Sequence, residues 1–328
     1  MLKVNYISFL HPSHFHGGGE LVINALIKYG KEQLGIQVNF VTLKPKVYEY
    51  NHNADLNWFA DIFNLPTSWR NQSKDQIRKM MRDKPFIHFD NAYVDTCNLD
   101  YLPCGGESSA QCPYKSEQPL MNKLKSLDFS DSCFAKTDLV KDLYSSSFLN
   151  VFVSPLHFKT THKLQGLKEE KSFILRPVID VQKFENKNQE RDIEYLYVGA
   201  INKAKGVDNL KKYFQKGGPG FGKKLTMLGN NTTGEKWDFA EELGFIPYDE
   251  IPRYYNRAKR FVHLPIWPEP QGRTVVEAAL CGCELITNEN VGATSFDFDL
   301  SNPSNLQNVE QEFWDKINIV LEESKKND

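Results

Sequence analysis

Two glutamates, Glu269 and Glu277, are the side chains best placed in this sequence to do chemistry together. They enclose seven residues, where a Pro-rich loop leads into an apolar segment that we expect to be helical from about Gly272. One carboxylate would therefore come from the loop and the other from the second turn of the helix. A helix start has free N–H groups and a partial positive charge, which favour phosphate. The pattern indicates a site for a phosphorylated ligand; the alternative is that either glutamate is structural.

Three glycines near the N-terminus form a second candidate site. The segment HPSHFHGGGE joins a β-rich segment, Lys3–Phe9, to one with helical periodicity, Gly18–Leu34. Glycines at such a strand-to-helix crossing let backbone N–H groups approach a ligand closely. Gly18 and Gly19 are therefore candidate ligand contacts, with a tight turn as the alternative explanation.

In the first half of the chain, alternating strands and helices are expected to position Gly18 and Gly19. Lys3–Phe9, Gly18–Leu34 and the strand Ile36–Leu43 make a parallel strand–helix–strand unit. Ser154 is expected to cap a further helix. The other expected elements are Ser68–Lys84, Pro85–Phe89, Leu139–Ser147, Val151–Val153 and Ser172–Leu175.

The second half repeats this alternation after a polar, aperiodic segment within Pro177–Asp192, which marks a linker. We therefore expect an α/β protein with two doubly wound, Rossmann-like domains at residues 1–180 and 181–308, and a last helix at 309–328. In such sheets the ligand lies outside the carboxyl ends of the strands. The expected elements here are Ile193–Gly199, Leu225–Gly229, Asp249–Lys259, Phe261–Pro265, Gly272–Leu280 and Glu284–Asn288.

Composition indicates an ordinary globular enzyme. The chain has 328 residues, 25% charged and 12% aromatic, with a net charge of −2, so no bulk attraction to nucleic acid is expected. The N-terminus predicts a buried strand and no apolar segment is long enough to span a bilayer, so we expect a cytoplasmic protein. Basic residues recur along one helix, as a solvated face or as a peripheral contact with anionic lipid: Arg70, Lys74, Arg78 and Arg82.

The six cysteines do not form a disulfide or zinc pattern. We expect no secretory signal, and the sequence contains no C-x-x-C pair, so reduced thiols and no bound metal are expected. A metal site remains the alternative for the loosely spaced group Cys97, Cys104, Cys112 and Cys133.

Four motifs, taken in order, resemble the glycosyl transferases group 1 family. They are YVGAINKAKG, LTMLGN, GFIPYDEI and the E-x7-E segment of Glu269 and Glu277. Members of that family are retaining nucleotide-sugar enzymes with the GT-B fold, in which two Rossmann-like domains face a cleft. The resemblance implies transfer of a sugar from a UDP- or GDP-sugar donor to a glycan, lipid-linked or other hydroxyl acceptor. It implies no metal and no further cofactor.

The resemblance also assigns roles to residues of the second domain. Lys205 would neutralise the donor diphosphate, Glu269 would lie beside the transferred sugar, and Glu277 would accept both ribose hydroxyls. The backbone around Ile246 would hold the base, with Asn230 also on the donor side. The helix start would offer N–H groups to phosphate from Gly272, Arg273 and Thr274.

In the first domain the resemblance points to the acceptor side of the cleft. Gly18 and Gly19 would contact donor phosphate or acceptor. Part of the family has a strand that ends in His or His-Asp before a Cys-containing loop, which implies a catalytic role for His88 or Asp90. The register leaves Asn91 as a third candidate, and a buried, hydrogen-bonded His88 is the alternative.

One position departs from the family pattern. A cation usually follows the glycine after the first strand of the second domain, and here that position holds Ala200. A diphosphate facing only Lys205 would be under-neutralised. We expect Arg273, whose planar guanidinium suits phosphate, to supply the missing charge; Lys203 is the competing candidate.

Three other classes of function are alternatives to sugar transfer. A GT-B sugar-nucleotide epimerase would share the same donor site. A non-catalytic sugar-nucleotide or glycan-binding protein would not need Lys205 and both glutamates. A serine hydrolase would use the glycine loop with Ser108, but the residue that should close its motif as glycine is Ala110.

Overall fold

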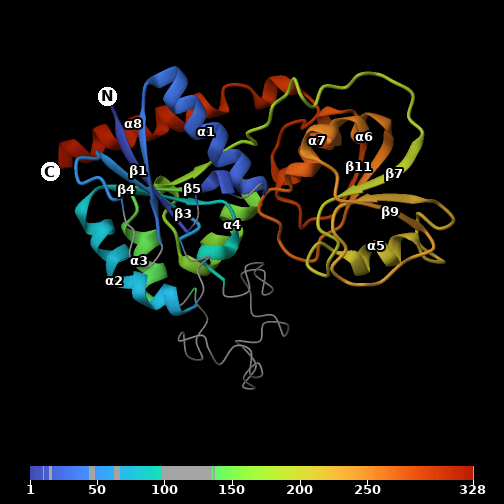
Figure 1. Cartoon of the computed structure of the whole chain (residues 1–328), viewed down its shortest axis with the longest axis horizontal. Helices are drawn as coiled ribbons and strands as arrows, with labels where there is room; N and C mark the ends of the chain where they lie inside the picture. Colours follow the sequence, from blue (N-terminus) through green and yellow to red (C-terminus); the bar gives the residue numbers. More distant parts are fainter. Residues whose placement is uncertain are drawn as a thin grey trace. The chain divides into compact units, whose positions relative to one another are not determined.

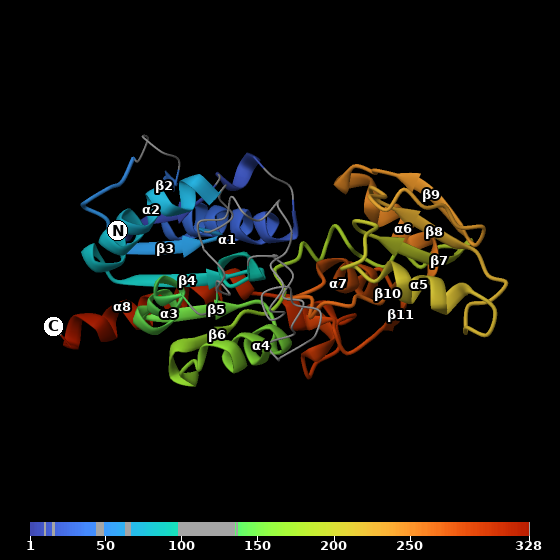
Figure 2. The ribbon, with the colours of Figure 1, turned by 90° about the horizontal axis from the view of Figure 1, so that it is seen from below.

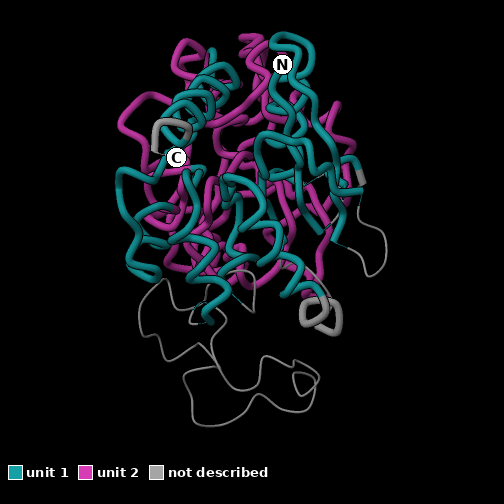
Figure 3. The backbone as a smooth tube through the Cα atoms, turned by 90° about the vertical axis from the view of Figure 1, so that its left-hand side faces the viewer, with its two compact units in different colours: residues 1–153, 158–176, 308–328 teal, residues 154–157, 177–307 magenta. Residues whose placement is uncertain are grey.

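The protein consists of two compact units (Figure 3). The computed structural model describes residues 1–9, 11–14, 17–43, 49–62, 67–97, 135 and 137–327. Unit 1 comprises residues 1–153, 158–176 and 308–328, and unit 2 comprises residues 154–157 and 177–307. Each unit is built around its own parallel sheet.

The described part of unit 1 contains a six-stranded parallel sheet in the order β2-β1-β3-β4-β5-β6. Its strands are β1 (Lys3–Ser8), β2 (Gln37–Thr42), β3 (Leu56–Ala60), β4 (Phe86–Asp90), β5 (Leu149–Phe152) and β6 (Ser172–Ile174). Its helices are α1 (Gly18–Leu34), α2 (Thr67–Asp83), α3 (Asp138–Ser146), α8 (Val309–Asn327) and most of α4 (Pro155–Gln165), which begins in unit 2.

Helices cover both faces of this sheet. Figure 1 shows α1 and α8 side by side on one face and α2 and α3 on the other. Strand β3, at the centre, was not predicted. All five of its residues are buried, so its sequence LNWFA lacks the alternation of a strand with one exposed face.

The last helix is fixed to unit 1 by an aromatic cluster. Trp314 on α8 is fully buried, and its Nε1 donates to the Leu26 carbonyl at 2.9 Å. Its ring packs on Gly30 of α1, where an added Cβ would lie 2.7 Å from the ring. The rings of Trp58 and Phe313 complete the cluster at 5.0 Å from one another. Residues 309–327 therefore pack on α1 and β3.

The described part of unit 2 contains a five-stranded parallel sheet in the order β11-β10-β7-β8-β9, as Figure 2 shows. Helix α5 covers one face, and α6 and α7 cover the other (Figure 1). The strands are β7 (Ile193–Val198), β8 (Leu225–Leu228), β9 (Ala240–Gly244), β10 (Ala258–His263) and β11 (Glu284–Thr287). The helices are α5 (Val207–Phe214), α6 (Ile251–Arg257) and α7 (Arg273–Leu280).

The limits of unit 2 differ slightly from the expected ones. Residues 177–180 belong to unit 2 because the Val178 carbonyl accepts a hydrogen bond from Arg273 Nη1 at 2.7 Å and Ile179 packs into the core of that unit. Residues 154–157 also belong to it, since Ser154 Oγ donates to the Pro270 carbonyl. The same Oγ accepts from His157 N at 3.0 Å, which is the predicted cap of α4.

We expect the packing of α8 on α1 to contribute strongly to the stability of unit 1. Trp314→Ala should lower the free energy of unfolding by about 3–5 kcal/mol, because it leaves a cavity in a tightly packed cluster. Urea unfolding followed by circular dichroism measures this loss. Ile319→Ala is the matched control on the same helix, because Ile319 is 50% exposed; similar losses in both variants would contradict the inferred packing.

Candidate functional site

Most of the predicted site residues lie at the carboxyl edge of the unit 2 sheet. Lys205 is in the turn after β7, Asn230 follows β8, and Glu269 is in the loop after β10. Because all five strands are parallel, their carboxyl ends meet at one edge, where a ligand is expected. Helix α7 begins four residues after Glu269 and brings Glu277 to its second turn.

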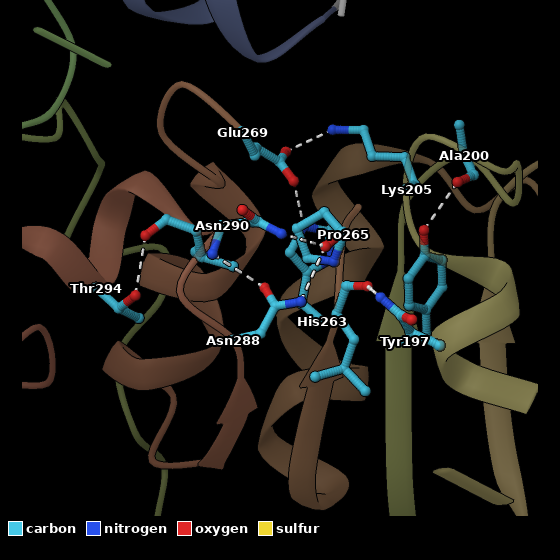
Figure 4. A network of polar contacts seen from close by, with 12 residues as sticks. Tyr197, Ala200, Lys205, His263, Pro265, Glu269, Asn288, Asn290 and Thr294 are labelled. Atoms are coloured by element: carbon cyan, nitrogen blue, oxygen red, sulfur yellow. Dashed lines mark hydrogen bonds and ion pairs between the residues drawn. The ribbon is translucent and has the colours of Figure 1, made fainter. Parts of the chain in front are cut away.

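The carboxylate of Glu269 is held on both oxygens (Figure 4). It is 7% exposed; Lys205 Nζ lies 2.5 Å from Oε1, and His263 Nε2 contacts Oε2. Burial alone would raise the pKa of Glu269, but its interactions with Lys205 and His263 outweigh burial and hold the pKa well below its usual range. Glu269 is therefore an anion at neutral pH.

His263, the last residue of β10, was not predicted as a site residue. It is 2% exposed, and its ring stacks on that of Tyr197. Its Nδ1 has no hydrogen-bond partner within the described ranges. Burying an unpaired N–H is costly, so the favoured tautomer carries its proton on Nε2 and donates it to Glu269. Its position at a strand end, six residues before Glu269, was the only signal in the sequence.

The two loops that bring Lys205 to Glu269 are in close contact. Gly206 has φ +83°, and a Cβ there would collide with the Leu264 carbonyl, so this turn requires glycine. Ile266 N donates to the Ala204 carbonyl at 3.1 Å. The turn after β7 is thereby pressed against the loop after β10.

Two asparagines that the sequence did not single out hold the loop after β10. The Pro265 carbonyl accepts from Asn288 Nδ2 at 2.9 Å and from Asn290 Nδ2 at 3.1 Å (Figure 4). The Asn290 carbonyl in turn accepts from Glu269 N at 2.8 Å. The backbone that carries the carboxylate is therefore fixed from both sides.

The start of α7 lies beside the Glu269 carboxylate. Gly272 precedes the helix with φ +80°, and a Cβ there would lie 3.9 Å from the carboxyl carbon of Glu269. The N-cap residue, Gly272, has no side chain that could cap the helix. The N–H groups of Gly272, Arg273 and Thr274 thus lie at a helix start near the Lys205–Glu269 pair, an arrangement that suits an anion.

Glu277 has different surroundings. It is 2% exposed; its Oε1 accepts from Tyr248 OH at 2.8 Å and from Arg273 Nε at 3.0 Å, and its Oε2 accepts from Tyr255 OH at 3.2 Å. Burial raises the pKa of Glu277 above its usual value, partly offset by Arg273 and the two hydroxyls. Sequence reasoning found Glu277 but neither tyrosine.

The Arg273 guanidinium is directed toward Glu277. Besides Glu277, it donates to the Val178 carbonyl and, through Nη2 at 3.0 Å, to Tyr248 OH. These hydrogen bonds use three of its five N–H groups. Ala200 and Lys203 are both exposed. That Arg273 replaces the cation absent at Ala200, with Lys203 as the competing candidate, stays a prediction.

The remaining predicted donor contacts are less constrained. Asn230 is exposed, and its carbonyl accepts from Ile201 N at 3.0 Å. Ile246 is half-buried and packs against the core of unit 2. Both lie on segments that follow strands β8 and β9 at their carboxyl ends.

The predicted residues of unit 1 lie at the start of α1 and in or just after β4. Gly18 and Gly19 open α1, and a Cβ on Gly19 would collide with the side chain of Asn91. His88 is fully buried, with Nε2 at 3.1 Å from Asp95 Oδ2. Asp90 is 1% exposed and accepts from Tyr144 OH at 2.6 Å. Of the three acceptor-side candidates only Asn91 is half-exposed.

Several predictions concern residues outside the described part. Cys104, Cys112, Cys133 and Ser108 lie there, as does the side chain of Arg70. Arg78 is half-buried and Arg82 exposed on α2. Across the described ranges, no group of His, Cys, Asp and Glu is arranged to hold a metal ion, and no helix has the length and apolar character to cross a membrane.

Comparison with solved structures identifies the fold as GT-B. HepE from Anabaena, in complex with UDP-glucose, matches with a TM-score of 0.55 at 15% identity, over 90% of this chain and 82% of that one. A sucrose-phosphate synthase from Thermosynechococcus elongatus gives 0.55 at 12% identity over 98% and 95%. WaaG, a glycosyltransferase of lipopolysaccharide biosynthesis, gives 0.51 at 11% over 95% and 93%. The predicted fold class is confirmed.

The family resemblance is confirmed by the sequence of the C-terminal part. Residues 178–327 match the family Glycosyl transferases group 1. This segment contains Lys205, Glu269 and Glu277. A search of curated protein sequences finds no match to the chain. The family match and the GT-B fold together support a glycosyltransferase.

We expect His263 to stabilise the charged form of Glu269. His263→Leu should lower the free energy of unfolding by about 1–3 kcal/mol at pH 7, because Glu269 Oε2 then remains buried without a donor. Thermal denaturation measures the loss. His263→Gln, whose side-chain amide can donate to the same oxygen, is the control and should lose less. Equal losses would mean that ring packing on Tyr197, and not the N–H group, is what matters.

Proposed function

We propose that this protein is a retaining glycosyltransferase that moves a sugar from a nucleoside-diphosphate donor to a hydroxyl group of an acceptor. The observation that carries the proposal is the grouping of Lys205, anionic Glu269 and the start of α7 at the carboxyl edge of one sheet. Glu277 is buried one turn further along the same helix.

The diphosphate of the donor is proposed to bind Lys205 and the first N–H groups of α7. Breaking the sugar–phosphate bond leaves negative charge on the diphosphate, and fixed positive groups stabilise that charge. An ammonium group has three N–H donors, so Lys205 can bind a phosphate oxygen while keeping its contact with Glu269. These groups supply the positive charge from the chain itself, and we propose that no metal ion is required.

Glu269 is proposed to act beside the transferred sugar. The anomeric carbon develops positive charge as the bond to phosphate breaks, so a nearby carboxylate anion stabilises and positions it. The depressed pKa of Glu269 keeps this carboxylate ionised. We propose retention of configuration on the basis of the family resemblance.

We propose a UDP-sugar as the donor, with a GDP-sugar as the alternative. HepE, a protein of the same fold, was determined in complex with UDP-glucose, and the backbone around Ile246 would hold the base. The acceptor is proposed to be a carbohydrate or lipid-linked glycan, on the side of Gly18, Gly19 and Asn91. His88 and Asp90 would then act on the acceptor from buried positions in β4. Peripheral membrane contact through the basic residues of α2 is proposed for a lipid-linked acceptor.

Substitutions of the two glutamates should differ in their effects on nucleotide affinity and on the rate of transfer. Glu277→Ala is expected to weaken binding of the nucleoside diphosphate by about 1.5–3 kcal/mol, because it removes charge-assisted hydrogen bonds to the ribose. Glu269→Ala should instead lower the rate of transfer more than the affinity. Isothermal titration calorimetry and release of nucleoside diphosphate from UDP- and GDP-sugars measure the two effects. Identical behaviour of both variants would contradict this division of roles.

Arg273 is proposed to supply the cation that Ala200 lacks. Arg273→Ala should cut the rate by about tenfold for each 1.4 kcal/mol of lost transition-state stabilisation. Adding Ala200→Arg should restore part of it, because a new cation would face the same phosphates. Failure of this rescue would mean that Arg273 acts only by supporting Glu277. Lys203→Ala is the control, and a loss confined to it would assign the role to Lys203.

A further inference from the structure

The hydrogen-bonding capacity of Glu277 is nearly filled by the protein itself. A carboxylate oxygen has two lone pairs. Oε1 accepts from both Tyr248 OH, at 2.8 Å, and Arg273 Nε, at 3.0 Å, and Oε2 accepts from Tyr255 OH at 3.2 Å. One acceptor position is left, whereas the two hydroxyls of a ribose need two. One of the three present donors must therefore leave when a nucleoside binds.

Tyr248 is the donor that can leave most easily. Tyr255 is fully buried on α6. Arg273 is anchored by a further hydrogen bond to the Val178 carbonyl, at 2.7 Å. Tyr248 is half-exposed, and it lies in the short turn Tyr248–Glu250 that follows β9 and precedes α6. Its ring packs against the edge of the core, and rotation of the side chain would free one lone pair on Glu277.

We infer that the Tyr248 hydroxyl occupies the position of a nucleoside hydroxyl on Glu277 and is displaced when the donor binds. This inference rests on the proposed role of Glu277. It makes Tyr248 a residue that sets the affinity for nucleotide. The hydroxyl keeps a buried carboxylate paired in the free protein, and every ribose that binds must compete with it.

The surroundings of the ring are compatible with such an exchange. Lys183 Nζ lies 3.9 Å from the centre of the Tyr248 ring, and the ring of Phe184 lies 5.7 Å away. Neither contact involves the hydroxyl. The hydroxyl contacts are those to Glu277 and to Arg273 Nη2. Tyr248→Phe therefore keeps the ring contacts and removes the competing donor.

The test compares two tyrosine-to-phenylalanine variants on the same carboxylate. Isothermal titration calorimetry is carried out with UDP or GDP, whichever the wild type binds more tightly, and with its 2′,3′-dideoxy analogue. Tyr248→Phe should bind the ribonucleotide about tenfold more tightly, because a charge-assisted hydrogen bond no longer has to be broken. Its affinity for the dideoxy analogue should equal that of the wild type. Tyr255→Phe should show no gain, because Tyr255 is fully buried and the position that it vacates on Oε2 is out of reach of a ribose.

The outcomes separate this inference from the proposed function. Weaker or unchanged binding of the ribonucleotide by Tyr248→Phe would overturn the inference, since the hydroxyl would then support Glu277 or be irrelevant to it. An equal gain in Tyr255→Phe, or with the dideoxy analogue, would overturn it as well. Glu277→Gln tests the proposed function itself: if that variant binds the ribonucleotide as the wild type does, Glu277 does not hold the ribose. Melting temperatures of all variants check that each is folded.

Discussion

A buried carboxylate must be compensated for the water that it loses, and Glu269 imposes this requirement on unit 2. Its compensation comes from the turn after β7, through Lys205, and from the end of β10, through His263. These segments meet only because Gly206 allows close approach to Leu264. Removing either partner would leave charge buried with too few donors. The carboxyl edge of the sheet is therefore organised before any ligand binds.

The second glutamate shows how the same residue type gains a different property. Glu269 and Glu277 are both buried, but Glu269 lies against a lysine and a histidine, whereas Glu277 meets two neutral hydroxyls and one arginine. The pKa of Glu269 is accordingly lowered and that of Glu277 raised. Environments that separate two carboxyl pKa values in this way indicate separate roles. Glu269 suits stabilisation of positive charge, and Glu277 suits exchange of hydroxyl donors.

The sequence predicted those features that are encoded locally. Helix α1 has the predicted limits, Gly18–Leu34, because glycines lie at its start and its apolar residues are periodic. Strand β3 was missed because it is buried on both faces, and β9, AEELG, because it is an edge strand with charged residues. The glutamate pair was found through its spacing. His263 and Tyr248 were not, since their contacts with the glutamates depend on how separate loops fold together.

The charge balance at the donor site adds a constraint that is not apparent from the E-x7-E motif or from the fold. In the free protein Lys205 faces Glu269, so the pair is close to neutral, and a diphosphate would bring further negative charge to it. His263 contacts Glu269 through Nε2, and Ala200 contributes no charge. Further N–H donors lie at the start of α7. Arg273 also has two N–H groups that its hydrogen bonds to Glu277, Val178 and Tyr248 do not use. Displacement of Tyr248 would release a third N–H group of Arg273. Binding of ribose at Glu277 would thereby make Arg273 more available to phosphate, which links the two ends of the E-x7-E segment through one guanidinium.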